Sequence, residues 1–247
     1  MNGDRSGEVK VLFLITARGG SKGVPRKNIK KISGIPLVAY KIIAARKSNI
    51  EGRIIVSTDD LEIAQICRDY GAEVPFMRPE YLAEDHSSSI DVVEHAMKWI
   101  RENDNEKYDY ICLLEPSSPF ASYVDIRNAF ERLEITGADT LLSVKEVEVN
   151  SAFIHTLDAQ GGLSYFYDSI CQMRDVRRQA QAAEYTMNGC MYIAKWEYFE
   201  KNKLFHSKYS IPYIMPNETS IEIDTMWDYQ MACWMVDNKM IDLSLWS

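Results

Sequence analysis

The sequence VKVLFLIT (residues 9–16), followed by ARGGSKGVPRKN (residues 17–28), decides the fold class of this chain. The first stretch is a continuous apolar run of strand length, and the second is rich in glycine. Apolar residues then recur at helical spacing over residues 35–48. The chain is therefore expected to open with a strand, a loop and a helix.

The same alternation continues through the first 144 residues. Apolar runs predict further strands at 53–57, 73–76, 108–114 and 139–144, and helical periodicity predicts helices at 61–70, 88–101 and 125–133. A βαβα series of this kind predicts an α/β fold, with a mostly parallel sheet and helices on both of its faces.

The alternation of strands and helices is interrupted over residues 145–184, which are polar and aromatic and contain several arginines. We interpret this segment as an inserted arm, in which Gly161-Gly162 marks a hairpin turn. Regular structure is expected to return with strands at 190–194 and 211–215 and helices at 196–201 and 225–238. A chain of 247 residues can bury one full core, so we expect a single domain over residues 9–247 that carries the arm.

Composition and charge exclude several classes of protein. The net charge of -8 disfavours a broad nucleic-acid interface, which needs clustered Lys and Arg. The apolar runs are too short to span a bilayer and the start of the chain is polar, so we expect a cytoplasmic protein without a membrane partner. The five cysteines are widely spaced and form no CxxC pair, which is typical of buried reduced thiols.

The glycine-rich loop has the chemistry of a phosphate-binding site. Its glycines leave backbone N–H groups open to an anion, and Arg18, Lys22, Arg26 and Lys27 add positive charge. In open α/β sheets, ligands bind beyond the carboxyl ends of the strands, where this loop is expected to lie. The loop matches neither the P-loop nor the dinucleotide fingerprint. A flexible basic surface loop is the alternative interpretation.

Residues 17–28 resemble the signature loop of the CMP-sialic acid synthetase family of cytidylyltransferases. Further matches to this family follow in the same order along nearly the whole chain. They are Ser57-Thr58-Asp59, Arg78-Pro79, Asp85-His86-Ser87-Ser88-Ser89, Leu113-Leu114-Glu115-Pro116-Ser117-Ser118-Pro119, Asn188-Gly189 and Ile221-Glu222-Ile223-Asp224-Thr225.

The resemblance implies a three-layer, Rossmann-like nucleotidyltransferase fold in which the arm at 145–184 forms a homodimer. It also implies a reaction in which the anomeric hydroxyl of a sugar acid attacks the α-phosphate of CTP. A CMP-sugar and pyrophosphate would be the products, with Mg²⁺ as the cofactor. We therefore expect CTP and a sugar acid as the partners of this chain, and no nucleic acid.

The resemblance assigns the loop cations Arg18, Lys22 and Lys27 to the triphosphate, with Lys22 as a catalytic residue. Cations on nonbridging oxygens and in-line positioning are the main sources of rate enhancement in phosphoryl and nucleotidyl transfer.

Four further polar residues match positions that contact the nucleotide in the family: Asn28, Arg78, Ser87 and Ser89. Taken singly, Arg78 before Pro79 could be a surface turn residue, and Ser87 or Ser89 could cap the following helix.

Glu222 and Asp224 alternate with Ile221 and Ile223, so in an extended segment both carboxylates project to one side. Two hard oxygen ligands suit a Mg²⁺ ion that also contacts triphosphate oxygens. A solvated polar face, or Asp224 as the N-cap of the next helix, is the alternative.

Arg178 aligns with the catalytic arginine of the family, and Arg174 and Arg177 are near alternatives in the same arm. Their other interpretation is an exposed basic stretch or a dimer contact. Tyr192 and Phe205 could line the sugar pocket or pack in the core.

The sequence departs from the family pattern at four positions. Glu115 stands where the family has Gln, beside the expected acceptor-sugar site, and it indicates another nonulosonic acid such as legionaminic or pseudaminic acid. Ala121 replaces a common Arg, Met187 a Pro, and Glu222 an Asp. A CMP-Kdo-type synthetase and a noncatalytic nucleotide-binding regulatory module are the competing interpretations.

Overall fold

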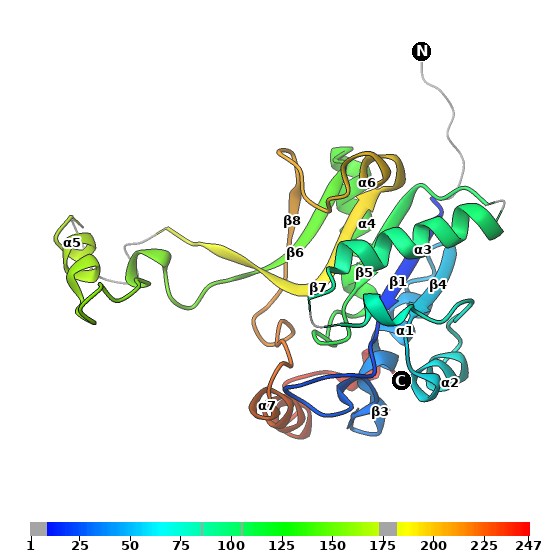
Figure 1. Cartoon of the computed structure of the whole chain (residues 1–247), viewed down its shortest axis with the longest axis horizontal. Helices are drawn as coiled ribbons and strands as arrows, with labels where there is room; N and C mark the ends of the chain where they lie inside the picture. Colours follow the sequence, from blue (N-terminus) through cyan, green and yellow to red (C-terminus); the bar gives the residue numbers. More distant parts are fainter. Residues whose placement is uncertain (1–8, 85, 105, 173–181) are drawn as a thin grey trace, which may run out of the picture.

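The computed structural model describes residues 9–84, 86–104, 106–172 and 182–247. Its centre is a six-stranded sheet with the strand order β4-β1-β5-β7-β6-β8. Helices cover both faces of the sheet and give the molecule three layers (Figure 1). The strands are β1 (Val11–Thr16), β4 (Gly52–Ser57), β5 (Tyr110–Leu114), β6 (Thr140–Glu146), β7 (Tyr185–Lys195) and β8 (Ile211–Ile214).

The strand directions confirm the predicted, mostly parallel sheet. β1 pairs in parallel with β4 and β5, and β6 pairs in parallel with β8. β7 runs antiparallel to both of its neighbours, β5 and β6. The helices are α1 (Leu37–Ser48), α2 (Leu61–Asp69), α3 (Ser89–Asn103), α4 (Tyr123–Thr136), α5 (Ser164–Gln172), α6 (Trp196–Asn202) and α7 (Met226–Asp237).

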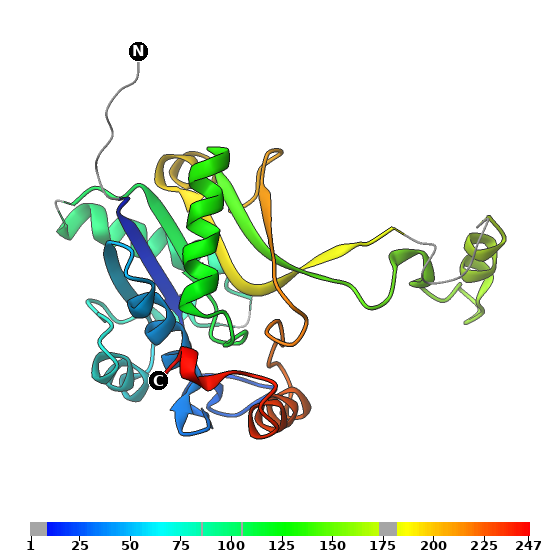
Figure 2. The same ribbon diagram turned by 180° about the vertical axis from the view of Figure 1, so that it is seen from behind.

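Strand β1 is buried on both of its faces. Phe13 and Ile15 join the apolar cluster under α1 and α4, whereas Leu12 and Leu14 join the cluster under α3 and α6. Figure 2 shows α4 and α1 on the face opposite to α3. Because successive side chains of a strand point to opposite faces, a strand covered on both sides has no polar position. This explains the continuous apolar run that opens the sequence.

A third apolar cluster lies beside the sheet and joins distant parts of the chain. It contains Val24 from the glycine-rich loop, Tyr40 from α1, Ile223, and Trp246 near the C-terminus. Tyr40 packs edge-on against Trp246, with ring centroids 5.5 Å apart. The glycine-rich loop and the segment before α7 are therefore held together by a shared core.

The strand predicted at residues 73–76 is wrong. Glu73 alone forms a bridge to Ile55, with its backbone N–H and C=O bonded to Ile54 and Val56 at 2.8 Å each. Pro75 follows two residues later and has no N–H to continue the ladder. The segment therefore leaves the sheet edge after one paired residue.

The Gly161-Gly162 pair forms a turn, but the predicted hairpin is wrong. The turn is closed by hydrogen bonds from Gly161 N to Asp158 O, at 2.9 Å, and from Asp158 N to Gly162 O, at 3.0 Å. It leads into helix α5 instead of into a strand. The strands that pair across this part of the chain are β6 and β7, through Glu146 and Tyr185.

The chain between β6 and β7 projects from the body of the molecule as an arm (Figure 1). The arm contains a short 3-10 helix, η3 (Ser151–Phe153), and α5. The two helices pack together, with the rings of His155 and Phe166 5.8 Å apart. The arm thus has internal contacts although it extends away from the sheet.

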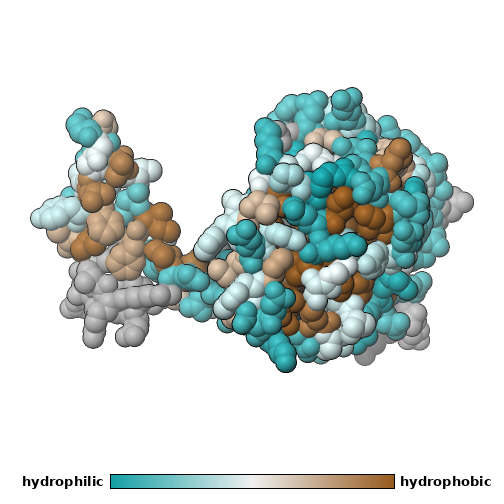
Figure 3. Space-filling view, turned by 90° about the horizontal axis from the view of Figure 1, so that it is seen from below, coloured by the Kyte–Doolittle hydropathy of each residue, from teal (hydrophilic) through white to brown (hydrophobic). Residues whose placement is uncertain are grey.

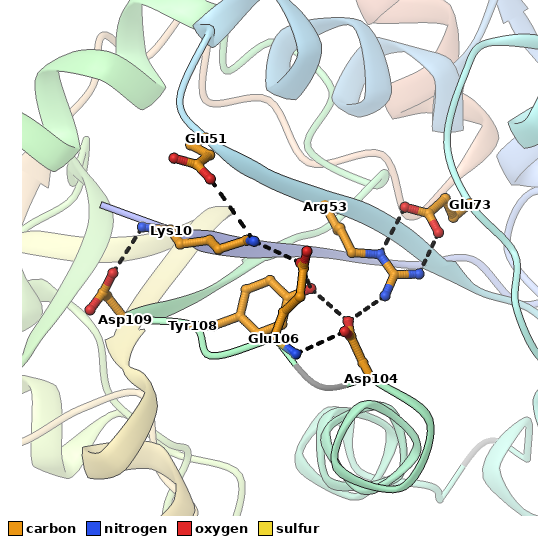
Figure 4. Close-up of polar contacts among 8 residues, drawn as sticks. All are labelled: Lys10, Glu51, Arg53, Glu73, Asp104, Glu106, Tyr108 and Asp109. Atoms are coloured by element: carbon orange, nitrogen blue, oxygen red, sulfur yellow. Dashed lines mark hydrogen bonds and ion pairs between the residues drawn. The ribbon is translucent and has the colours of Figure 1, made fainter. Parts of the chain in front are cut away.

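An ion-pair network ties together the amino ends of the central strands (Figure 4). Lys10 before β1 contacts Glu106 at 2.7 Å, and Arg53 of β4 contacts Asp104 at 2.5 Å. The hydroxyl of Tyr108 donates to Asp104 at 3.0 Å. Since phosphate-binding loops follow the carboxyl ends of strands, this network stabilises the edge of the sheet opposite to the candidate site.

No helix within the described ranges is long and apolar enough to span a membrane. All five cysteines are described and all are free; Cys67, Cys112 and Cys190 are buried.

Candidate active site

Three strands end at one edge of the sheet, and the residues that follow them line a cavity. The loop after β1, residues 78–84 between α2 and α3, and the residues after β5 meet there, together with the start of α3. The cavity has a volume of about 250 Å³. It is lined by Thr16, Arg18, Lys27, Asn28, Arg78, Leu82, Glu84, Ser87, Ser89, Val92, Glu115, Pro116 and Ser117.

Two glycines of the loop lie against neighbouring backbone or side chains. A Cβ on Gly23 would lie 1.9 Å from the backbone oxygen of Asp224, so only glycine allows this approach. The N–H of Gly19 donates to Asp59 after β4, at 2.9 Å. The loop is therefore folded onto the site, which contradicts the alternative of a flexible surface loop.

The four cations of the loop point in different directions. Arg18 and Lys27 line the cavity, and Lys22 lies on the exposed part of the loop beside Gly23. Arg26 instead forms ion pairs with Asp60 and Glu62 at the start of α2. Arg26 is thus engaged by the N-cap residue Asp60 and by Glu62 of α2, and it does not line the cavity.

Lys27 and Asn28 connect the loop to the rest of the site. The ammonium of Lys27 donates to the backbone oxygen of Ile223, at 2.8 Å, and to Asp224 Oδ1, at 3.1 Å. The amide of Asn28 is buried and donates to the backbone oxygen of Arg18, at 2.9 Å. Asn28 therefore closes the loop on itself while it lines the cavity.

Arg78 is buried, so the alternative of a surface turn residue is wrong. Its guanidinium donates to the hydroxyl and the backbone oxygen of Ser57 at the end of β4. Burial, with a smaller contribution from the charge of Arg18, lowers the pKa of Arg78 to about 10, although Asp59 opposes the shift. Arg78 remains a cation at neutral pH, fixed at the wall of the cavity.

The three consecutive serines before and at the start of α3 have separate roles. Ser88 is the N-cap and accepts hydrogen bonds from Ile90 N and Asp91 N. Ser87 donates to the backbone oxygen of Tyr81, at 2.8 Å, and Ser89 lies 3.5 Å from Glu115. Because Ser88 caps the helix, the alternative that Ser87 or Ser89 does so is wrong, and both of these line the cavity.

A bulge in β7 brings Asn188 and Gly189 to the site. The β6–β7 register shifts between Leu142 and Val144, opposite these residues, and Gly189 has a φ of +68°. A Cβ on Gly189 would lie 2.8 Å from Ser118 Oγ, 3.3 Å from Glu222 Oε1 and 3.7 Å from Glu115 Oε2. Glu115 and Glu222 therefore converge over the same glycine.

Burial and neighbouring charges change the acidity of both carboxylates. Burial raises the pKa of Glu115, and the charge of Glu222 raises it further, whereas Lys41, Ser89 and Lys27 act in the opposite direction. Loss of hydration and the charge of Asp224 raise the pKa of Glu222, and Lys27 and Lys145 oppose this. Such a group of like charges is stabilised by a bound cation.

Glu222 and Asp224 alternate with buried Ile223 in the way the sequence predicts. Ile223 lies in the third apolar cluster, and both carboxylates are exposed. The N-cap of α7 is Thr225, in a capping box with Asp228, so the alternative of Asp224 as N-cap is wrong. Hard carboxylate oxygens fit a divalent cation. Over the described residues, however, no three His, Cys, Asp or Glu side chains converge on a metal site.

Comparison with known proteins identifies the family. The model of the cytidylyltransferase family matches residues 12–214. The chain belongs to this family. The CMP-N,N'-diacetyllegionaminic acid synthase of Legionella pneumophila is 34% identical to it over 242 residues, which cover 96% of this chain and 98% of that protein. A pseudaminic acid cytidylyltransferase of Campylobacter jejuni is 31% identical over 226 residues, which cover 91% of this chain and 95% of that protein.

Solved structures agree with this assignment at the level of the fold. A CMP:2-keto-3-deoxy-manno-octonic acid synthetase complexed with CTP superposes with a TM-score of 0.66 and 15% sequence identity. The match covers 93% of this chain and 99% of that one. The Rossmann-like nucleotidyltransferase fold expected from the sequence is confirmed.

The remaining predicted site residues of this cytidylyltransferase lie in β7 and the arm. Tyr192 is half-buried, with its ring centroid 6.1 Å from that of Phe205. Burial raises the pKa of Tyr192, and the charges of Glu115 and Glu222 add to this. Phe205 itself packs in the core against Phe199. Arg178, with Arg174 and Arg177, lies outside the described residues.

Sequence reasoning missed three polar residues near the site of this cytidylyltransferase. Lys145 at the end of β6 lies 3.4 Å from the backbone oxygen of Ser220 and within electrostatic reach of Glu222. Ser118 is buried, and the described residues supply its hydroxyl with no hydrogen-bond partner. Lys41 is fully buried in α1. A lysine among apolar residues on the inner face of a helix is the signal that could have found Lys41.

Proposed function

We propose that this chain transfers the cytidylyl group of CTP to a nonulosonic sugar acid, with release of pyrophosphate. The proposal rests on a single observation: one site brings together the glycine-rich loop, the cavity at the carboxyl ends of β1, β4 and β5, and the carboxylates before α7. The chain with this site belongs to the cytidylyltransferase family. The named relatives are a legionaminic acid synthase and a pseudaminic acid cytidylyltransferase, both aligned over nine-tenths of this chain or more.

Each group at the site has a role that its chemistry suits. Arg18, Lys22 and Lys27 would bind the triphosphate and stabilise charge that develops at the α-phosphate. Asn28, Arg78, Ser87 and Ser89 would hold the nucleotide through an amide, a forked donor and two hydroxyls. Glu115 and Tyr192 would face the acceptor sugar, and Arg178 from the arm would assist as a catalytic residue.

Mg²⁺ is the cofactor that the donor chemistry favours, held by Glu222 and Asp224. Two carboxylates are few for a complete metal site, so triphosphate oxygens and water would supply the other ligands. When bound, the ion would neutralise charge on the triphosphate. The Lys27 ammonium lies 3.1 Å from Asp224 Oδ1 and would bridge this carboxylate and the phosphates.

A homodimer is the assembly that the arm supports. Large apolar side chains of the arm are exposed: Ile154, Leu157, Leu163, Tyr165 and Tyr167. Figure 3 shows hydrophobic residues gathered on the arm, apart from the body of the molecule. Exposed apolar patches of this kind mark interaction sites, and a second copy of the chain would bury them.

We place the enzyme in the cytoplasm, since its five free cysteines suit a reducing compartment.

The test is pyrophosphate release by the purified chain with CTP and Mg²⁺, over a panel of N-acetylneuraminic, legionaminic, pseudaminic and Kdo acids. We expect release with CTP and one of the first three acids, and none with CTP alone. Turnover with Kdo alone would assign the chain to CMP-Kdo-type synthetases. Binding of CTP without turnover of any acid would support the noncatalytic module instead.

A further inference from the structure

Helix α7 is apolar on its outer side as well as on its inner side. The inner side chains Ala232, Met235 and Val236 are buried in the third apolar cluster. Trp227 and Trp234 lie on the outer side and are 70% and 54% exposed. A helix that is apolar all round is normally buried on every side. The outer side of α7 is therefore a surface that another part of the assembly is expected to cover.

The two tryptophans border a groove on this outer side. Residues seven positions apart lie on the same face of a helix, two turns from each other. The groove has a volume of about 300 Å³ and is lined by Trp227, Gln230, Met231 and Trp234. Aromatic residues and Met are the types enriched at protein interfaces. The groove therefore suits an apolar protein segment as its occupant.

A second groove connects α7 with the base of the arm. It has a volume of about 510 Å³, and its lining includes Val149 and Ile154 on the side of the arm. Ile221 and Met235 line it on the side of α7. Met235 is the next residue after Trp234 in the helix. Apolar surface therefore extends from the outer side of α7 to the base of the arm.

The arm of the same chain does not cover α7. Figures 1 and 2 both show α5 at the outer end of the arm, apart from α7. The chain thus exposes two apolar surfaces, one on the arm and one on α7, that do not meet within one copy. In a two-fold dimer each arm can reach the α7 of the other copy, so both contacts form at once.

The size of the two surfaces distinguishes this arrangement from a direct contact between the α7 helices of two copies. The large exposed side chains of α7 are Met226, Trp227, Trp234 and Met240, and those of the arm include Ile154, Leu157, Leu163, Tyr165 and Tyr167. At roughly 200 Å² for each fully exposed side chain, contact of α7 with α7 would bury about 800 Å² in total. Stable dimers bury about 1,200–2,000 Å². Contact of each α7 with the arm of the other copy would bury about 2,000 Å², which is enough.

We propose that the outer side of α7, with Trp227, Met231 and Trp234, is the surface that receives the arm of a second copy of this chain. This inference rests on the homodimer of the proposed function and names the surface that the arm covers. Helix α7 follows Glu222 and Asp224 directly after its N-cap Thr225. The arm of the partner would therefore lie beside the segment that carries these two carboxylates.

Cross-linking of the full chain with a bis-maleimide tests which surfaces meet. Cys171 of α5 is exposed, and Gln230→Cys places a thiol in the groove of α7; Cys233→Ser removes the other thiol of this helix. We expect Gln230→Cys with Cys233→Ser to give a cross-linked dimer in which mass spectrometry finds the α5 peptide joined to the α7 peptide. Adding Cys171→Ser should abolish this product.

Other products of the same reaction would overturn the proposal. A dimer that forms without Cys171, through two α7 peptides, would assign the groove to contact between α7 helices. A dimer joined only through two α5 peptides would place arm against arm and leave α7 uncovered. Absence of any cross-linked dimer, in a protein that light scattering shows to be dimeric, would place the interface outside both surfaces.

Substitution of the two tryptophans measures how much the surface contributes. Trp227→Ser with Trp234→Ser should raise the dissociation constant of the dimer by at least about 100-fold, since buried tryptophans are frequent hot spots of interfaces. Leu61→Ser with Ile135→Ser is the matched control, because both residues are at least as exposed and lie on α2 and α4. The control should keep the wild-type dissociation constant in sedimentation equilibrium. Equal constants in the two double variants would overturn the proposal.

These readouts do not depend on the reaction. A wild type that stays monomeric at all concentrations would overturn both the homodimer and this inference. A dimer cross-linked between α5 and α7 that releases no pyrophosphate with any sugar acid would leave the interface intact and refute the proposed activity.

Discussion

Lys22 and Lys27 are five residues apart in the sequence and have different surroundings. Lys27 is held by Ile223 and Asp224, almost two hundred residues away in the chain. Lys22 lies on the exposed part of the loop, beside the glycine that contacts Asp224. The sequence shows only that both are cations of the glycine-rich loop. Which of them is held against the carboxylates depends on a contact that only the fold creates.

Substitution of Lys22 is the sharpest test at the scale of single residues. We expect Lys22→Ala to lower kcat by about 10²–10³, because it removes a cation that would stabilise charge on the leaving phosphate oxygens. Lys31→Ala is the matched control, since Lys31 is an exposed lysine beyond the loop, and it should retain wild-type kcat. Steady-state pyrophosphate release measures both. An unchanged kcat in Lys22→Ala would remove it from the catalytic residues.

The serines at the start of α3 and the arginines of the glycine-rich loop have roles that the sequence alone does not predict. Three serines in a row lie before and at the start of α3, and their composition does not tell which one caps the helix; the backbone geometry selects Ser88. Arg18 and Arg26 are likewise equivalent by composition, yet Arg26 turns to the acidic start of α2. Ordered motifs therefore predicted many of the residues that line the cavity, but not the division of roles within each motif.

The helices and strands with a clear hydrophobic pattern in their own sequence were predicted well. β1, β4, β5 and helices α1 to α4 lie within a few residues of their predicted positions. The apolar residues that each of them buries are recognisable in its own sequence, as a strand-length run or at helical spacing. β7 begins at Tyr185, five residues before the predicted start, because it pairs with the end of β6 along the base of the arm. Such non-local pairing leaves little trace in a single sequence.

The glycine-rich loop is an element whose shape can be tested with two glycines three residues apart. In Gly23→Ala the new methyl group would lie 1.9 Å from the Asp224 carbonyl and force the loop away from Glu222 and Asp224. Nothing lies within 4 Å of the corresponding Cβ position on Gly20. We expect Gly23→Ala to lose at least about 10²-fold in kcat/KM for CTP, since misplacement by an ångström costs that much.

Gly20→Ala is the control for the loop and should keep activity within about threefold of the wild type, which is under 1 kcal/mol in transition-state stabilisation. Both variants are to be compared by CTP titration of initial rates and by thermal unfolding. Loss of activity in the two variants alike would mean that the loop needs flexibility at every glycine. It would also contradict the specific role of the Gly23–Asp224 contact.

At the scale of the whole molecule, the chain consists of a three-layer body and an arm that the body does not cover. The body buries its apolar residues in three clusters around the sheet and beside it. The arm leaves large side chains in solvent: Tyr167 is 69% exposed and Leu163 is 63% exposed. A monomer would gain nothing from such a surface. The sequence indicated the arm only by the break in its periodicity.

Dimerisation through the arm is therefore the prediction that concerns the whole molecule. Tyr167→Glu places a charge in the proposed interface and should convert a dimer to a monomer, because an unpaired charge cannot be buried at little cost. Tyr209→Glu is the matched control, since Tyr209 is 73% exposed on the loop before β8 of the body. The Tyr209→Glu variant should remain a dimer. Light scattering coupled to gel filtration gives the mass of each variant.

Activity distinguishes a structural dimer from a functional one. If the partner's arm completes the site, monomeric Tyr167→Glu should release pyrophosphate at a small fraction of the wild-type rate, and its rate should rise with protein concentration as residual dimer forms. A dimeric Tyr167→Glu would place the interface elsewhere. A fully active monomer would show that the body alone carries the reaction, and it would remove Arg178 of the arm from the catalytic residues.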